Sequence, residues 1–175
     1  MLSKKLAEAL NKQINAEFYS AYLYYSMSSY FTSKSLRGFA NWTTVQAQEE
    51  MTHAIRLYNY VNNSGGRALM QAIEAPPTEW KSPLEVFREI YKHEVKVTGM
   101  IHKLLTLATE EKSYPTMVEL QWFVTEQVEE EASADEIVRK LELMEGAPGG
   151  LFMIDQQLAQ RVFVMPPWLG GGQGA

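Results

Sequence analysis

Carboxylate and amide side chains interrupt the apolar stripes of two helical segments in the second half of this sequence. In residues 83–111, apolar residues recur every three or four positions, and Glu94 takes one step of that stripe. In residues 114–144, Gln127 and Glu130 interrupt a similar stripe and lie three positions apart, so they share one helix face. Side chains of these types bind metal ions, and their place in the stripe directs them inward. The spacing therefore predicts a metal site inside a helical bundle.

The first half of the sequence carries a matching set. Glu17 and Tyr24 belong to a series spaced by seven residues, which drifts by only about 20° per heptad and so keeps one helix face. Glu50 and His53 are three residues apart and share a face of the next helical segment. Each of the four segments thus places an acid or an amide in the core. The predicted two-metal set consists of Glu17, Glu50, His53, Glu94, Gln127 and Glu130.

Equal spacing places these side chains at one height. Glu17 and Glu50 are 33 residues apart (50 − 17), and Glu94 and Gln127 are also 33 apart (127 − 94). Residues equidistant from the turn of a helical hairpin lie side by side, and at about 1.5 Å per residue each of these four lies roughly 25 Å from its turn. The equality predicts two similar halves related by a pseudo-twofold axis. One half reads Glu, then Glu-x-x-His, and the other reads Glu, then Gln-x-x-Glu.

Several buried carboxylates repel one another and lose hydration, which is costly unless a cation or hydrogen bonds compensate, and a pair of metal ions supplies that compensation. Oxygen ligands with one imidazole suit iron or manganese, and zinc can occupy such a site as well. Glu50 is the expected bridge between two ions a few ångströms apart. The half that contains Gln127 and Glu130 departs from the symmetric Glu-x-x-His pattern of two-metal bundles. We therefore expect a weaker, more exchangeable second metal position there.

Glycine and proline punctuate the chain sparsely, and the runs between them predict an all-α protein. Four long helices are expected, followed by a short fifth one; the predicted ranges are Ser3–Phe31, Arg37–Asn63, Pro83–Glu111, Tyr114–Met144 and Leu151–Val164. Short connections make the first two helices one hairpin and the next two another. About eighteen residues join the hairpins, long enough to cross the length of the bundle. One long crossover between the second and third helices is typical of the ferritin-like four-helix bundle.

Composition narrows the function further. The chain contains no cysteine, which excludes disulfides, thiolate metal sites and thiol nucleophiles. Its net charge is −5 without a block of Lys or Arg, so nucleic acid is not an expected partner. No apolar run approaches the ~20 residues of a membrane span, and no signal pattern opens the sequence, so we expect no membrane association and a cytoplasmic location. Residues 1–164 are predicted to form one domain, and residues 165–175 a flexible Pro/Gly-rich tail.

Extended motifs on all four long helices resemble those of a known family. They read INAEFYSAYLYYSM, FANWTTVQAQEEMTHAIRLYNYV, IYKHEVKVTGMIHKL and ELQWFVTEQVEEE, in chain order. With these motifs the chain resembles a non-haem ferritin of the bacterial and archaeal type. The resemblance implies a hollow cage of twenty-four identical subunits, in which Fe(II) is oxidised by dioxygen or peroxide and stored as a ferric mineral.

The resemblance also implies roles for single residues. Glu17, Glu50 and His53 would hold one iron of a ferroxidase centre; Glu50, Glu94 and Glu130 would hold the second, with Gln127 alongside and Tyr24 close by. A third iron position would be formed by Glu49, Glu126, Glu129 and Glu130. The implied cofactor content is thus two iron ions per subunit with a possible third, cycling between Fe(II) and Fe(III), and no haem.

Two alternatives remain at this point. The first is a haem-containing bacterioferritin, in which Met51 would be the haem ligand; its fourth helix is expected to carry Glu-x-x-His where this chain has Gln127-x-x-Glu130. The second is a helical bundle without catalytic function, which leaves the inward acids unexplained. His93 and His102 do not share the face of Glu94, and we expect them to be ordinary surface or partly buried residues. Glu131 is expected to be a surface charge.

Overall fold

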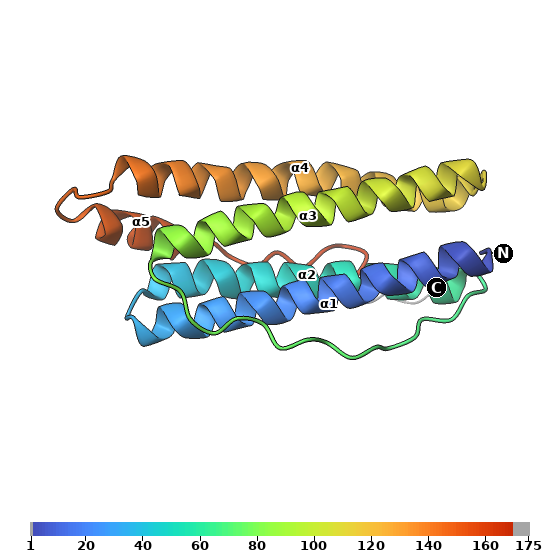
Figure 1. Cartoon of the computed structure of the whole chain (residues 1–175), viewed down its shortest axis with the longest axis horizontal. Coiled ribbons are helices and arrows are strands. Elements are labelled where there is room, and N and C mark those ends of the chain that lie inside the picture. Colours follow the sequence, from blue (N-terminus) through green and yellow to red (C-terminus); the bar gives the residue numbers. More distant parts are fainter. Residues whose placement is uncertain (1, 170–175) are drawn as a thin grey trace.

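Four long helices, each of 27 to 30 residues, form two antiparallel hairpins that pack side by side (Figure 1). The computed structural model describes residues 2–169. Its helices are α1 Lys4–Ser33, α2 Arg37–Asn63, α3 Pro83–Glu110, α4 Tyr114–Leu143 and α5 Gly150–Leu158. No strand occurs within these described residues. The predicted four-helix bundle with a long α2–α3 crossover and a short fifth helix is confirmed, and the bounds of the four long helices differ from prediction by two residues at most.

The two hairpins turn in the same way. Ser35 and Lys112 adopt φ angles of 60° and 53° in the left-handed region, although neither is glycine. In each turn, the N–H of the next residue donates to the carbonyl five positions back, at 3.0 and 2.8 Å. Ser35 lies 18 residues after Glu17 (35 − 17), and Lys112 lies 18 after Glu94 (112 − 94). The equal offsets give the two hairpins the matched geometry that the sequence spacing predicts.

The crossover between α2 and α3 is extended and runs along the outer side of α1 (Figure 1). Near its beginning, the side chain of Asn11 donates to the carbonyl of Arg67 at 3.0 Å and accepts the N–H of Leu69 at 2.6 Å. Near its end, Trp80 is buried with its ring 5.3 Å from that of Tyr30. The crossover is thus tied to α1 at both ends, and it returns the chain to the start of α3.

Apolar side chains form two separate cores along the bundle. One lies at the end that carries α5 and includes Phe31, Phe39 and Phe87. The other lies toward the opposite end, where the chain begins, and includes Leu10 and Ile101. Between these cores, the interior is occupied by the polar side chains described below.

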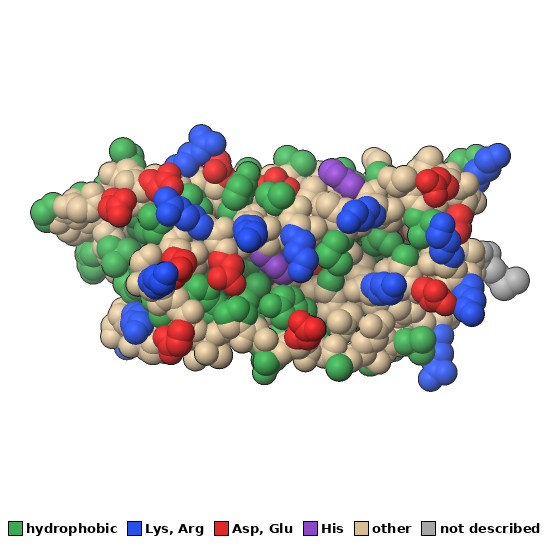
Figure 2. Space-filling model, viewed as in Figure 1, with side chains coloured by type: hydrophobic (Ala, Val, Ile, Leu, Met, Phe, Trp, Pro, Cys, Tyr) green, Lys and Arg blue, Asp and Glu red, His purple; other side chains and the backbone are tan. Residues whose placement is uncertain are grey.

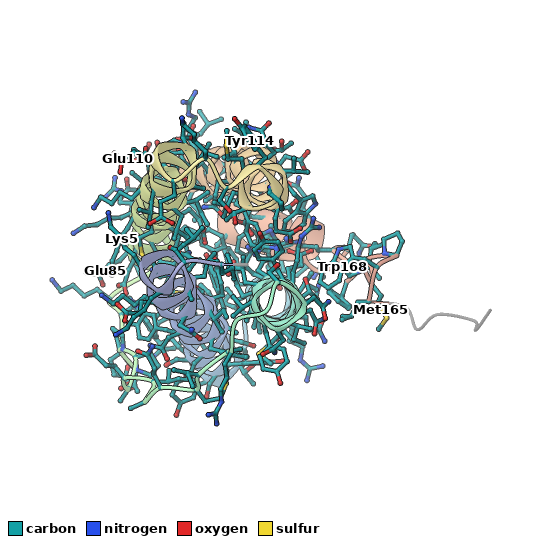
Figure 3. All side chains as sticks on the ribbon, turned by 90° about the vertical axis from the view of Figure 1, so that its right-hand side faces the viewer. Lys5, Glu85, Glu110, Tyr114, Met165 and Trp168 are labelled. Carbon is teal, nitrogen blue, oxygen red and sulfur yellow. The ribbon has the colours of Figure 1, made fainter. Side chains whose placement is uncertain are left out.

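The fifth helix ends at Leu158, so its predicted extension to Val164 is wrong. The physical reason is a competing set of hydrogen bonds. The side-chain amide of Asn41 donates to the carbonyls of Leu158 and Arg161, at 3.2 and 2.9 Å, and holds the chain in an extended path. Residues 160–169 then follow α2, and Trp168 lies beyond α2 on the side away from α1 (Figure 3). Of the predicted flexible tail, residues 165–169 lie on this path, and residues 170–175 lie outside the described residues.

Charges of both signs are mixed over the face seen in Figure 2, with Lys and Arg interspersed among Asp and Glu. Among residues 2–169, no helix combines the length and apolar character needed to cross a membrane.

Candidate metal centre

Two clusters of acidic side chains meet in the middle of the bundle and share one residue. Glu17 of α1 lies with Glu50 and His53 of α2, and the ligand atoms of the three are within 4.8 Å of one another. Glu94 of α3 and Glu130 of α4 form a second cluster with the same Glu50 under the same distance limit. Glu17, Glu50 and Glu94 are each 1% exposed, and the Glu130 side chain is 8% exposed. The structure thus brings together the acids and the histidine of the predicted set, with Glu50 at the centre.

Glutamine side chains orient part of this cluster. Gln13 donates to Glu17 Oε1 at 2.8 Å, and Gln46 donates to Glu130 Oε1 at 2.9 Å and, more weakly, to Glu50 Oε1 at 3.4 Å. Each of these glutamines stands four residues before a glutamate of the site, one helical turn away on the same face. Neither glutamine is among the site residues predicted from the sequence, although the repeated Gln-x-x-x-Glu spacing in α1 and α2 is a signal for both.

Two carboxylate oxygens of the cluster have no hydrogen-bond donor. Glu17 Oε2 and Glu130 Oε2 are buried, and no donor among the described residues reaches either atom. A buried acceptor without a partner costs free energy, and a buried carboxylate costs more. Both oxygens belong to the acidic clusters, so a bound cation would satisfy them. The donor set, four carboxylates with one imidazole, fits divalent ions such as Fe(II) and Mn(II).

Burial raises the pKa of all four central carboxyl groups. The pKa of Glu94 rises to about 7, chiefly through desolvation, although hydrogen bonds from Tyr24 and Gln127 oppose the rise. The pKa values of Glu50 and Glu130 lie well above the ordinary range, because burial is reinforced by the charges of neighbouring carboxylates. Burial also raises the pKa of Glu17, with the charge of His53 opposing it. The metal-free cluster therefore holds protons that a divalent cation would displace.

Tyr24 is fully buried and donates its hydroxyl to Glu94 Oε1. Burial and the charge of Glu94 hold the pKa of this phenol well above its usual value, so Tyr24 remains a protonated donor. Its ring meets that of His93 edge-on at 6.3 Å. His93 is half-buried and contacts the Ser20 hydroxyl at 2.8 Å. Burial lowers the pKa of His93 to about 4, so this histidine is neutral. It is a partly buried residue outside the cluster.

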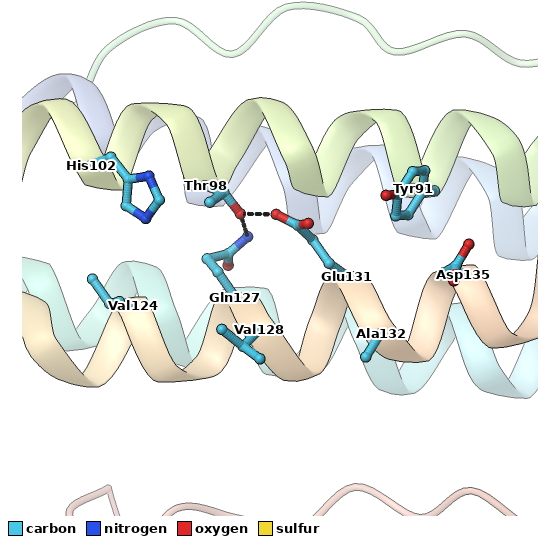
Figure 4. Close-up of a pocket in the computed structure, with 9 residues that line it drawn as sticks. All are labelled: Tyr91, Thr98, His102, Val124, Gln127, Val128, Glu131, Ala132 and Asp135. Atoms are coloured by element: carbon cyan, nitrogen blue, oxygen red, sulfur yellow. Dashed lines mark hydrogen bonds between the residues drawn. The ribbon is translucent and has the colours of Figure 1, made fainter.

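Gln127 lies between the cluster and a pocket on the α3–α4 face (Figure 4). Its amide nitrogen is 3.3 Å from Glu94 Oε2 and 3.3 Å from the Thr98 hydroxyl oxygen. Thr98 in turn donates its hydroxyl to Glu131 Oε1 at 2.5 Å, which leaves the Thr98 oxygen free to accept from the amide. Glu131 is therefore more than the surface charge that the sequence predicts, because it sets the direction of this hydrogen-bond chain. His102 is exposed at the same pocket.

The four acids of the implied third position are only partly assembled. Glu126 and Glu130 lie with His53 in a third cluster, within 4.8 Å of one another. Glu129 is exposed and belongs to none of the three clusters found among the described residues. Glu49 is half-buried and is ion-paired with Arg161, from the segment that follows α5.

Met51 is 36% exposed and so points away from the buried cluster on α2. His53, by contrast, is 3% exposed and is packed edge-on against Trp122 and Phe123, with ring centroids 5.2 and 5.9 Å away. These rings fix the imidazole plane and exclude water from one side of the cluster. The position of His53 is thus as well determined as those of the carboxylates around it.

Comparisons with known proteins agree with this geometry. The chain matches the profile of the ferritin-like domain over residues 7–144. A bacterial non-heme ferritin of Bacteroides fragilis is 45% identical over 161 residues, which cover 92% of this chain and 100% of the relative. A bacterial non-heme ferritin of Staphylococcus aureus is 38% identical over 163 residues, which cover 93% of this chain and 98% of the relative.

Solved structures are similar over the same extent. An Archaeoglobus fulgidus ferritin, engineered into a closed form by site-directed mutagenesis, aligns with a TM-score of 0.92 and 52% identity, covering 94% of this chain and 100% of that one. The open-pore ferritin from the same archaeon aligns with a TM-score of 0.91 and 52% identity, over 93% and 100% of the two chains. The fold is that of a ferritin-like four-helix bundle, and the clustered acids form a candidate metal centre inside it. The chain belongs to the ferritin family, as its motifs predict.

Proposed function

We propose that this protein stores iron, oxidising Fe(II) to Fe(III) with dioxygen or peroxide inside the bundle and keeping the ferric product in a hollow cage of identical chains. The observation that carries the proposal is the pair of buried acidic clusters joined through Glu50, with an unsatisfied oxygen on Glu17 and another on Glu130. The names of the relatives, bacterial non-heme ferritins, support iron as the cargo and no haem.

The two clusters supply two binding sites for substrate iron. Glu17 and His53 hold one ion and Glu94 and Glu130 hold the other, while Glu50 reaches both because it belongs to both clusters. Only the first of these sites contains an imidazole. We infer that the second site, made of carboxylates with the Gln127 amide alongside, exchanges its ion more readily.

Protons and electrons leave the site together. The raised pKa values of Glu50, Glu94 and Glu130 mean that these groups release protons when Fe(II) takes their oxygens. Two bound Fe(II) ions supply one electron each, and dioxygen becomes hydrogen peroxide on accepting these two electrons and two protons. Tyr24 keeps a hydroxyl proton at Glu94 Oε1, where it orients that carboxylate. The surrounding aromatic rings and apolar cores exclude bulk water from the reaction.

Storage requires an enclosed cavity, which one bundle cannot provide. We propose that residues 1–164 form the subunit of a twenty-four-chain cage, on the strength of the close structural match to ferritins, with residues 165–175 as an appended tail. A cytoplasmic protein without nucleic-acid or membrane partners is in keeping with the net charge of −5 and the mixed surface charges. A third iron position on Glu49, Glu126, Glu129 and Glu130 is part of the proposal.

Aerobic addition of Fe(II) to metal-free protein tests the function, with ferric absorbance as the readout. The parent is expected to oxidise Fe(II) faster than buffer, and Glu50→Ala and His53→Ala are expected to lose the rapid phase. Glu110→Ala is the matched control, because Glu110 is exposed at the end of α3, far along the helix from the cluster. Circular dichroism and native mass establish that each variant remains helical and assembled.

Oxidation by the parent at the rate of buffer alone would contradict the ferroxidase assignment. A parental rate in either site variant would show that Glu50 and His53 do not hold the reacting iron. A native mass corresponding to a single chain would contradict storage in a cage.

A further inference from the structure

Residues 160–169 form a strap that lies along α2 (Figures 1 and 3). The strap begins after α5, which is docked on the first turn of α2. There the Asp155 carboxylate accepts the backbone N–H groups of Gly38 and Phe39, at 2.8 and 3.1 Å. A carboxylate at a helix N-terminus is favourably placed, so the origin of the strap is fixed.

Arg161 is the residue of the strap that contacts Glu49, the neighbour of Glu50 in α2. Its carbonyl accepts from Asn41 at 2.9 Å, its guanidinium lies over the Trp42 ring at 4.5 Å from the centroid, and Nη2 pairs with Glu49 Oε2. The backbone contact fixes the position of the residue, and the two contacts of the guanidinium orient its side chain. The side chains of both partners are only partly exposed, at 24% for Arg161 and 29% for Glu49.

Glu49 is also one of the acids that belong to the proposed third iron position. Its charge acts on that of Glu126, which lies with His53 and Glu130 at the edge of the inner centre. Arg161 already compensates the charge of this carboxylate, so the guanidinium and a metal ion would compete for Glu49. The chain thus supplies its own cation at the place where an outer iron would be held.

We propose that Arg161 is a tethered competitor for the outer metal position, and that an ion must displace its guanidinium from Glu49 in order to bind there. The proposal rests on the proposed function for the identity of the ion, and it adds a residue that determines the affinity of one position. Arg161 lies beyond residues 7–144, the range matched by the family profile.

The charge of Arg161 is expected to lower the metal affinity of the outer position by a measurable factor. A guanidinium within contact distance of a half-buried carboxylate stabilises its charge, and removal of that cation leaves the carboxylate free for a divalent ion. We expect the outer position to bind metal roughly tenfold more tightly without Arg161. The ligands of the inner sites include Glu17, Glu50, Glu94 and Glu130, which Arg161 does not contact. The metal affinity of the inner sites is therefore expected to stay the same.

Isothermal titration of metal-free, assembled protein with Fe(II) under anaerobic conditions measures both kinds of position. In Arg161→Gln the affinities of the two inner sites should be unchanged, and the outer site should tighten about tenfold. Arg139→Gln is the matched control, since it removes the same charge from an exposed residue that pairs with Asp135 on α4. Arg161→Lys keeps the charge at the strap and should bind within about threefold of the parent.

An outer site in Arg161→Gln that is no tighter than in Arg139→Gln would overturn the proposal. So would equal tightening in Arg161→Lys, because loss of charge would then not be the cause. Glu49→Gln should abolish the gain, so that the double variant with Arg161→Gln matches Glu49→Gln alone; a remaining gain would also overturn it.

Failure of the proposed function gives a different result. If the parent does not bind two Fe(II) ions per chain at inner sites, the two-iron centre is wrong. The role of Arg161 is then judged by titration of the same variants with Tb(III), an oxygen-seeking ion for carboxylate positions, where the same order of affinities is required.

Discussion

Replacement of Glu94 by Gln is expected to stabilise the metal-free protein at pH 8 while weakening its metal centre. Glu94 is 1% exposed, and its pKa is raised from an ordinary 4.5 to about 7, chiefly by desolvation. The raised pKa means that ionisation at pH 8 costs the folded chain about 3 kcal/mol more than the unfolded chain. Glutamine has nearly the same shape and avoids this cost.

The sign of the pH dependence follows from proton binding. Between pH 4.5 and 7 the folded chain holds the Glu94 proton while the unfolded chain has released it, so stability falls as pH rises through this window. This contribution is fully present below pH 4.5 and is lost above pH 7. From pH 5 to pH 8, the Glu94→Gln variant should therefore gain about 2 to 3 kcal/mol per chain relative to the parent.

Thermal unfolding of the metal-free parent and variant at the two pH values checks this prediction. Glu110→Gln, at an exposed position, serves as the control and should show no comparable gain. Addition of Zn(II) or anaerobic Fe(II) should reverse the order at pH 8, because a metal that binds only the folded state stabilises the parent more than the variant. A stability difference that is the same at pH 5 and pH 8 would refute the argument from burial of Glu94.

Three further predictions concern the packing and the site. Gly38→Ala would place a Cβ only 1.6 Å from the Asp155 carbonyl oxygen, so α5 should detach, with a loss of several kcal/mol measured by thermal unfolding and an altered assembly measured by native mass. Ser35→Gly should stabilise the chain by about 0.5–1 kcal/mol in the same unfolding assay, since the φ of 60° favours glycine; a decrease would contradict this account of the turn. Tyr24→Phe removes the donor to Glu94 and should slow Fe(II) oxidation several-fold with unchanged anaerobic Fe(II) stoichiometry, and an unchanged rate would show that this hydrogen bond is not needed.

Much of the fold can be predicted from the sequence because the residues that mark helix ends and the spacing that pairs residues across each hairpin indicate the same bundle. The 33-residue spacing of Glu17 with Glu50, and of Glu94 with Gln127, places each pair at one level. In the structure Glu17 lies in a cluster with Glu50, and the Gln127 amide is 3.3 Å from Glu94 Oε2. Helix bounds are close to prediction because serine caps, prolines and glycines mark the ends of the helices. The acids of the site and His53 can be predicted because an ionisable residue is unusual within the apolar stripe of a helix.

Other features depend on tertiary contacts that no local pattern encodes. The sequence predicts that the fifth helix continues past Leu158, yet the Asn41 amide from α2 donates to the carbonyls of Leu158 and Arg161, so α5 ends early. The hydrogen bond from Thr98 to Glu131 joins two helices and is visible only once α3 and α4 are paired. The ion pair of Glu49 with Arg161 spans 112 positions of the chain, and neither residue alone predicts it.

The division of the apolar core has a consequence for the way this protein responds to its cargo. The carboxylate layer between the two cores interrupts the hydrophobic contacts that would otherwise make the bundle one cooperative unit. In the proposed function, bound iron bridges the two hairpins across this layer and so cross-links them at the middle of the bundle. Backbone amides beside the layer should then exchange hydrogen more slowly when iron is loaded, so that the rigidity of each subunit reports how full its own centre is.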